Sequence, residues 1–85
     1  MRVTVLLFAA ARVRAGSPTW VVELAEPATV ADLKAALGGS CPALVPLMES
    51  SRVAVDAAYA AEDDLISPNA EVAMIPPVSG GAGVD

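Results

Sequence analysis

The chain has no histidine, one cysteine and one residue each of Phe, Trp and Tyr, and these shortages exclude several kinds of site. Cys41 has no second cysteine with which to form an internal disulfide, and no histidine to serve as its base or to share a metal ion. We therefore expect Cys41 to be a packed thiol, which is compatible with a reducing cytoplasm, and we expect no bound metal.

Basic residues are also scarce, with five against ten acidic residues and a net charge of -5. They are mostly scattered along the chain, whereas a nucleic-acid partner requires a clustered positive patch. No apolar run approaches the roughly 20 residues that a membrane-spanning helix needs. The apolar run at the N-terminus is similar to a short signal peptide, but arginines stand where its cleavage region would be. We interpret that run as a strand and expect a cytoplasmic protein without nucleic-acid or membrane partners.

Eighty-five residues suffice for one domain, and their pattern begins with a hairpin. Residues 2–9 carry apolar side chains on both faces, which indicates a central strand covered on more than one side. A turn signal at residues 15–18 precedes residues 19–24, whose alternation predicts the antiparallel partner strand.

A helix is predicted from Thr29 to about Leu37. Thr29 is a good N-cap, and Asp32 three positions later completes a variant of the capping box. Apolar residues recur at helical spacing through this segment, and Gly38 fits the left-handed C-cap at which we expect the helix to end.

The remaining strands are expected at residues 52–55, 58–60 and 71–75, with residues 42–48 too short and broken for a long helix. This order favours an α+β fold of the β-grasp type. In that fold the helix packs on one face of a mixed sheet, and the first and last strands lie adjacent and parallel at its centre.

The segment after the last strand is the most specific feature of the sequence. Pro76 and Pro77 should end sheet pairing and project the chain in extended form, while Gly80 and Gly81 could thread a channel too narrow for side chains. We therefore expect a domain over residues 1–77 and a flexible tail over residues 78–85.

The chain resembles the small subunits of molybdopterin synthase. These subunits form a family of ubiquitin-like sulfur carriers. The resemblance extends from the N-terminal strand to Gly81, and its specific part is the Pro-Pro-Val-small-Gly-Gly ending. The segments that carry it are residues 5–9, 13–16, 28–33, 53–56, 64–66 and 71–81.

This resemblance implies a carrier whose terminal glycine carboxylate is adenylated by an ATP-using activating enzyme and then converted to a thiocarboxylate. The large subunit of a heterotetrameric synthase would receive the tail, and the sulfur would pass to cyclic pyranopterin monophosphate during molybdenum cofactor biosynthesis. The carrier itself would be a non-catalytic subunit that binds no cofactor, because its reactive group is the backbone terminus.

Carried over to this sequence, the resemblance makes Gly81 the thiocarboxylate carrier. The residues implied in binding partners are Phe8, Met74, Ile75, Pro76, Pro77, Val78, Ser79 and Gly80. The family commonly has an aromatic residue near Met74 and Ile75; the aliphatic residues here predict a smaller, still hydrophobic interface.

Residues 82–85 follow Gly81 and must be explained. The carboxylate of Gly81 is tied up in an amide bond with Ala82, so we expect an inactive precursor that a processing protease cuts after Gly81. Two other functions remain open. One is a sulfur carrier of thiamine or cysteine biosynthesis, and the other is a β-grasp binding module whose tail is never activated.

Overall fold

Alternating buried and exposed side chains form the first strand, β1 (Arg2–Leu7), whose Val3, Val5 and Leu7 point into the core. The computed structural model of the protein describes residues 1–77. Strand β2 (Thr19–Glu23) pairs antiparallel with β1, and β7 (Val72–Ile75) pairs with it in parallel on the other side. Strands β4 (Arg52–Val55) and β5 (Ala58–Tyr59) complete a sheet of order β2-β1-β7-β4-β5. The predicted central, parallel pair of first and last strands is confirmed.

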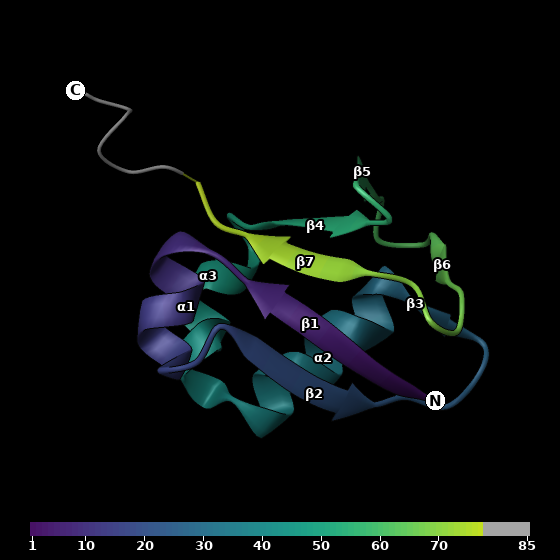
Figure 1. Ribbon diagram of the computed structural model, residues 1–85, viewed down its shortest axis with the longest axis horizontal. Helices are drawn as coiled ribbons and strands as arrows, with labels where there is room; N and C mark the ends of the chain where they lie inside the picture. Colours follow the sequence, from purple (N-terminus) through teal and green to yellow (C-terminus); the bar gives the residue numbers. More distant parts are fainter. Residues whose placement is uncertain (78–85) are drawn as a thin grey trace.

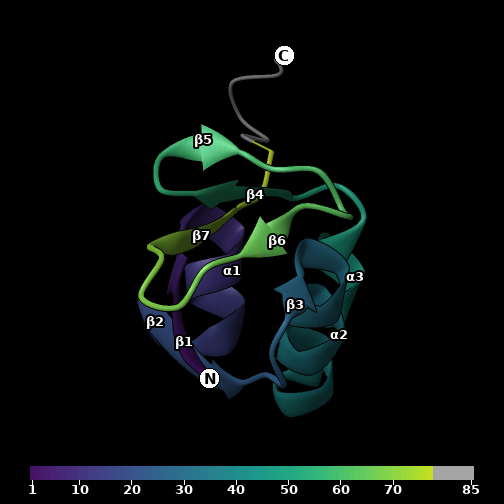
Figure 2. The same cartoon turned by 90° about the vertical axis from the view of Figure 1, so that its right-hand side faces the viewer.

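All the helices of the described chain lie on one face of this sheet, as the two views show (Figure 1, Figure 2). They are α1 (Ala9–Ala15), α2 (Val30–Ser40), α3 (Val45–Met48) and the 3-10 turn η1 (Pro42–Leu44). The core lies between the layers, where its largest fully buried side chains are Leu33, Leu37, Leu44, Met74, Val5, Val30 and Val72. The opposite face of the sheet carries no helix of residues 1–77. The predicted β-grasp arrangement is therefore confirmed.

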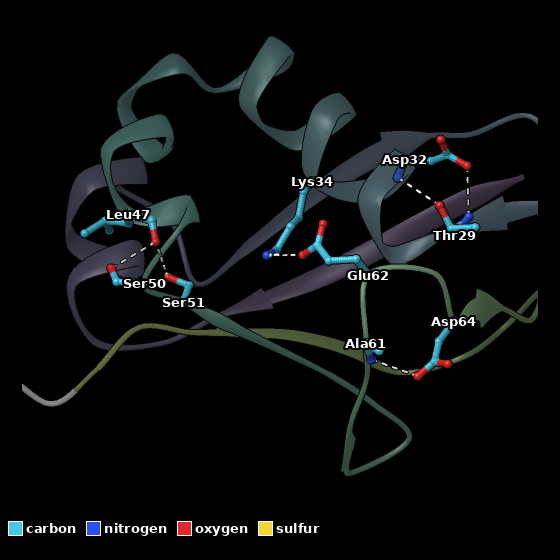
Figure 3. A network of polar contacts seen from close by, with 9 residues as sticks. All are labelled: Thr29, Asp32, Lys34, Leu47, Ser50, Ser51, Ala61, Glu62 and Asp64. Atoms are coloured by element: carbon cyan, nitrogen blue, oxygen red, sulfur yellow. Dashed lines mark hydrogen bonds and ion pairs between the residues drawn. The ribbon is translucent and has the colours of Figure 1, made fainter.

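The start of α2 matches the prediction. The backbone N–H of Asp32 donates to the Thr29 hydroxyl at 3.2 Å, and the N–H of Thr29 donates to the Asp32 carboxylate at 2.9 Å (Figure 3). Both members of the capping box are thus present, and they satisfy two of the amides that a helix start leaves without partners. The negative charge of Asp32 also lies at the positive end of the helix dipole.

The predicted end of α2 is wrong. The helix runs through Gly38 and Gly39 to Ser40, and its C-cap is Cys41. A Cβ on Gly38 would come within 3.2 Å of the Val45 side chain, so close packing favours glycine at this position, which does not adopt a left-handed turn. Tertiary packing has here overridden the low helix propensity of two glycines.

Helix α1 was not predicted. The expected first strand, residues 2–9, ends at Leu7, and Ala9 already belongs to the helix. Alanines and arginines, both good helix formers, fill α1, and Gly16 ends it in the left-handed conformation with φ 72°. Because Ala11 is fully buried, α1 closes one end of the core.

A second, two-stranded sheet was also missed. Strands β3 (Ala28–Thr29) and β6 (Leu65–Ile66) pair antiparallel beside the start of α2. The loop before β6 is tied to α2, because the N–H groups of Val30 and Ala31 donate to backbone carbonyls of that loop. Within residues 1–77, no helix is long and apolar enough to cross a membrane.

Candidate functional site

The site begins where β7 leaves the sheet. Strand β7 alternates, with Val72 and Met74 buried and Ala73 and Ile75 partly exposed, and the alternation continues through a buried Pro76 and an exposed Pro77. Strand β7 ends at the side of the sheet where α1 also lies (Figure 1). The last described segment is thus anchored to the core by every second residue.

On the helix-free face beside this segment the sheet is hollowed. We call this hollow the open-face groove; its volume is about 360 Å³ and it is lined by Leu6, Phe8, Ala54, Ala57, Tyr59, Glu71, Ala73 and Ile75. Phe8 is 46% exposed and Tyr59 62%, so two of the three aromatic side chains of the protein face solvent here. Exposed aromatic and aliphatic side chains gathered in one concave surface are typical of a protein-binding site.

Strand register explains why the groove forms. Leu6 of β1 is level with Ala73 of β7, Ala73 with Ala54 of β4, and Ala54 with Tyr59 of β5. The two alanines lie in the middle of this row and larger side chains lie at its ends, which leaves the centre low. The row therefore makes a shallow depression with apolar side chains on both sides.

Arg52 gives the groove one charged border. Its guanidinium carbon lies 4.3 Å from the centroid of the Tyr59 ring, a cation–π arrangement, and Arg52 is the register partner of Ile75. At the other end of the same face, Arg2 donates to the Glu23 carboxylate at 2.8 Å. That hydrogen bond raises the pKa of Arg2, which leaves its charge unchanged because arginine is already protonated at neutral pH.

The predicted site residues divide into three groups. Phe8 and Ile75 line the groove, and Pro77 is exposed beside it. Met74 is 1% exposed and Pro76 is buried, so the expectation that they present a surface to partners is corrected: the even-numbered positions of this segment face the core. Val78, Ser79, Gly80 and Gly81 lie outside the described residues.

Sequence reasoning missed Leu6 and Tyr59 as members of the groove. Leu6 could have been found, because the alternation of β1 places it on the same face as Phe8. Tyr59 reaches the groove only through the pairing of β5 with β4, which the sequence does not specify.

The chemistry of the groove is that of recognition. Its only acidic group is Glu71, its only hydroxyl is Tyr59, and the protein has no histidine to act as a base at neutral pH. Among residues 1–77, no three side chains of the types that ligate metals come together. The lining of the groove, mainly apolar with two aromatic side chains, is typical of a surface that recognises another protein.

Comparison with solved structures supports this assignment of the fold. SAMP1 from Haloferax volcanii is 32% identical, with a TM-score of 0.86, over 95% of this chain and 100% of that protein. A Pyrococcus furiosus protein assigned as molybdopterin converting factor subunit 1 is 26% identical, with a TM-score of 0.81, over 92% of this chain and 99% of that one. The complex of subunits 1 and 2 of the molybdopterin-converting factor from Helicobacter pylori contains the same fold at 15% identity, with a TM-score of 0.68, over 92% and 96% of the two chains.

A sequence model of one protein family matches the chain as well. The match covers residues 5–81, from β1 through the two glycines of the tail, and stops before the last four residues. The match thus spans the strands, the helices and the Gly-Gly ending together. The chain belongs to the ThiS family.

Proposed function

We propose that this protein is the sulfur-carrying small subunit of molybdopterin synthase. The Gly81 carboxylate, once exposed, is adenylated by an activating enzyme that uses ATP and is converted to a thiocarboxylate. The tail then enters the large synthase subunit, where the sulfur passes to cyclic pyranopterin monophosphate. The carrier binds no cofactor itself.

One observation carries this proposal: the open-face groove lies directly beside the strand that leads into the Gly-Gly tail. Ile75 belongs both to β7 and to the groove, so a partner that grips the apolar groove also receives the tail. The groove is lined mainly by apolar side chains, as suits a carrier whose partners supply the catalytic groups. The family match that reaches Gly81 adds support.

Two of the similar structures bear on the partner. The Helicobacter pylori structure contains subunit 1 bound to subunit 2, and the Pyrococcus furiosus protein is assigned as subunit 1. We infer that the present chain likewise associates with a large subunit, through Phe8, Ile75 and the other residues of the groove.

The proposal requires that residues 82–85 be removed. Adenylation needs a free carboxylate, and the carbonyl of Gly81 is in an amide bond with Ala82. Val84 and Asp85 carry side chains that a channel sized for glycine should reject. A protease that cuts after Gly81 is therefore part of the proposed pathway.

The similarity to SAMP1 favours a second candidate, a protein modifier. SAMP1 from Haloferax volcanii is a small archaeal modifier protein, and it is 32% identical to this chain. A modifier would use the same activated Gly81, but its carbonyl would be attacked by an amine of another protein. Both candidates share the activation step and differ in the acceptor.

Reconstitution separates the candidates. The full chain and a chain ending at Gly81 are each incubated with the activating enzyme, ATP and a sulfur source, and intact mass is measured. We expect an oxygen-to-sulfur exchange in the shorter chain alone, and then sulfur transfer to cyclic pyranopterin monophosphate when the large subunit is added.

Each other result has a distinct meaning. Activation of the full chain at Asp85 would refute the precursor model. Thiocarboxylation without transfer to the pterin would indicate a carrier for another pathway, such as thiamine or cysteine biosynthesis. Conjugates with lysine residues of other proteins, formed without sulfur transfer, would identify a modifier. Failure of both chains to be activated would favour a binding module.

A further inference from the structure

The amino acids of this protein contain very few groups that could attack an activated carbonyl. Lys34 is the only lysine, Cys41 the only cysteine, and the other four of the five basic residues are arginines. Arginine stays protonated in proteins and is not a nucleophile at neutral pH. When Gly81 of this protein is activated as an acyl adenylate, Lys34 therefore supplies the only ε-amino group of the chain that could react with it.

That amino group is engaged. The Lys34 ammonium donates to the Glu62 carboxylate at 2.6 Å, and the Lys34 side chain is 21% exposed (Figure 3). An amine attacks a carbonyl through its lone pair, which in a paired ammonium is occupied by a proton. Reaction at Lys34 thus requires the ion pair to open and the proton to leave.

The carboxylate that holds Lys34 is positioned by the backbone. The N–H of Ala31, in the first turn of α2, donates to the carbonyl of Glu62 at 2.9 Å, and Lys34 lies one helical turn further on. The Asp64 carboxylate accepts from the N–H of Ala61 at 2.8 Å and fixes the same loop (Figure 3). The pair forms between two anchored segments, so less conformational entropy opposes it than in a typical surface pair.

The thiol of Cys41 and the α-amino group of Met1 are restrained as well. Cys41 is 6% exposed within the core cluster, where its thiol is shielded from a tail of another copy. The α-amino group of Met1 donates to the carbonyl of Leu24 and lies 4.0 Å from the Glu26 carboxylate, so it is held by two partners.

We propose that the domain is arranged to carry an activated C-terminal glycine without acylating itself, and that the Lys34–Glu62 pair is the device that protects its only lysine. The inference rests on the proposed activation of Gly81. It adds that conjugates, where the protein acts as a modifier, contain a single copy of it and not chains of copies.

The reaction that is suppressed can be written in full. The neutral amine of Lys34 attacks the Gly81 carbonyl of an adenylate on a second copy. A C–N bond forms, the C–O bond to AMP breaks, AMP leaves with the electron pair, and the nitrogen releases one proton. The product is an isopeptide-linked dimer.

The experiment uses the chain ending at Gly81 with the activating enzyme and ATP, and pyrophosphate release reports activation separately from its outcome. Dimers are measured by intact mass. Digestion with trypsin then identifies the site of linkage. Because the sequence has no lysine or arginine after Arg52, the C-terminal peptide of the donor copy is residues 53–81, and a linkage at Lys34 joins this peptide to the Lys34 side chain of the acceptor copy. We expect little dimer from the natural sequence.

Three variants make the test specific. Glu62→Gln frees Lys34 and should raise its conjugation by about two- to fivefold, the range that corresponds to an exposed ion pair. Asp63→Asn removes the same charge from the neighbouring position, which makes no ion pair with Lys34 in the described structure, and should change nothing. Ala35→Lys adds an amine on an exposed position of α2 and should give the most dimer.

Two results would overturn the inference while pyrophosphate release shows normal activation. One is a natural chain that conjugates through Lys34 as fully as the Ala35→Lys variant does through its added lysine. The other is an Ala35→Lys variant that forms no dimer, because availability of an amine would then not be what limits self-acylation. Absence of pyrophosphate release would instead contradict the proposed function. In that case a chemically prepared Gly81 thioester replaces the adenylate, with the same variants and the same readings.

Discussion

Along β1, Val3, Val5 and Leu7 are buried under the helices, whereas Leu6 and Phe8 on the same strand face the open-face groove. The two faces of the sheet differ in the same way throughout β7. One face is closed by branched aliphatic residues packed against helices, and the other has small residues in its centre and larger ones at its border. Stability therefore depends mainly on one face and recognition on the other, so substitutions should separate the two properties.

The largest expected effect is on the covered face. Leu33→Ala removes a fully buried side chain between α2 and the sheet and should lower the free energy of unfolding by about 2–5 kcal/mol. Urea denaturation followed by circular dichroism measures this change. Leu6→Ala, on the open face, is the matched control and should cost about 1 kcal/mol or less. Equal losses for the two leucines would remove the distinction between the faces.

The second effect is on binding through the open face. Ile75→Asp should weaken association with the large subunit or the activating enzyme by about 30-fold or more, as loss of a central apolar contact does. The fold should tolerate the change, because the new carboxylate would lie level with Arg52. Calorimetric titration measures the affinity.

Val21→Asp provides the control for that experiment. Val21 is also an exposed apolar residue on the open face, but it lies on β2 outside the groove. The Val21→Asp variant should bind the partner with nearly the affinity of the natural sequence. Loss of binding in both variants would extend the interface beyond the groove, and loss in neither would place it elsewhere.

A third substitution tests how the helix layer is fixed to the covered face. Thr29→Ala removes the side chain that accepts from the Asp32 amide and should cost about 1 kcal/mol of unfolding free energy. Thermal denaturation should show a lower midpoint than that of Thr4→Ala, in which an exposed threonine of β1 is changed. Binding to the partner should be unchanged in both.

The smallest effect is expected at the junction of the two faces. Ala9 follows Phe8 directly and has φ 50°, a conformation that glycine adopts without the clash of a Cβ. Ala9→Gly should stabilise the protein by about 0.5 kcal/mol. Ala10→Gly, one residue further into α1, should destabilise it by about the same amount. Shifts of the same sign in the two variants would contradict the assigned backbone conformation.

The sequence predicted the covered face better than the open one. Strand alternation and the capping box depend on residues near one another in the chain, so β1, β2, β7 and the start of α2 could be found directly. The end of α2 could not, because Gly38 is placed by contact with Val45, seven positions later. Helix α1 was missed because Phe8 and Ala9 read equally well as the end of a strand.

For the site, the structure leaves Phe8 exposed and Ile75 partly exposed, and their role in binding remains a prediction. The sequence alone could not tell which of Met74 and Ile75 faces the core. That depends on which face of β7 the helices cover. Tyr59 and Ala54 enter the groove by pairing between strands, and pairing partners are not readable from one sequence.

Strand β7 is hydrogen-bonded along both sides, to β1 and to β4. Under the proposed function, an enzyme that drew the tail into a narrow channel would pull along the axis of this strand, while the bonds that retain it run across that axis. The load is then shared by many bonds in shear instead of opening them one after another from an edge. A domain built this way should stay folded while a partner pulls on the segment that follows Pro77.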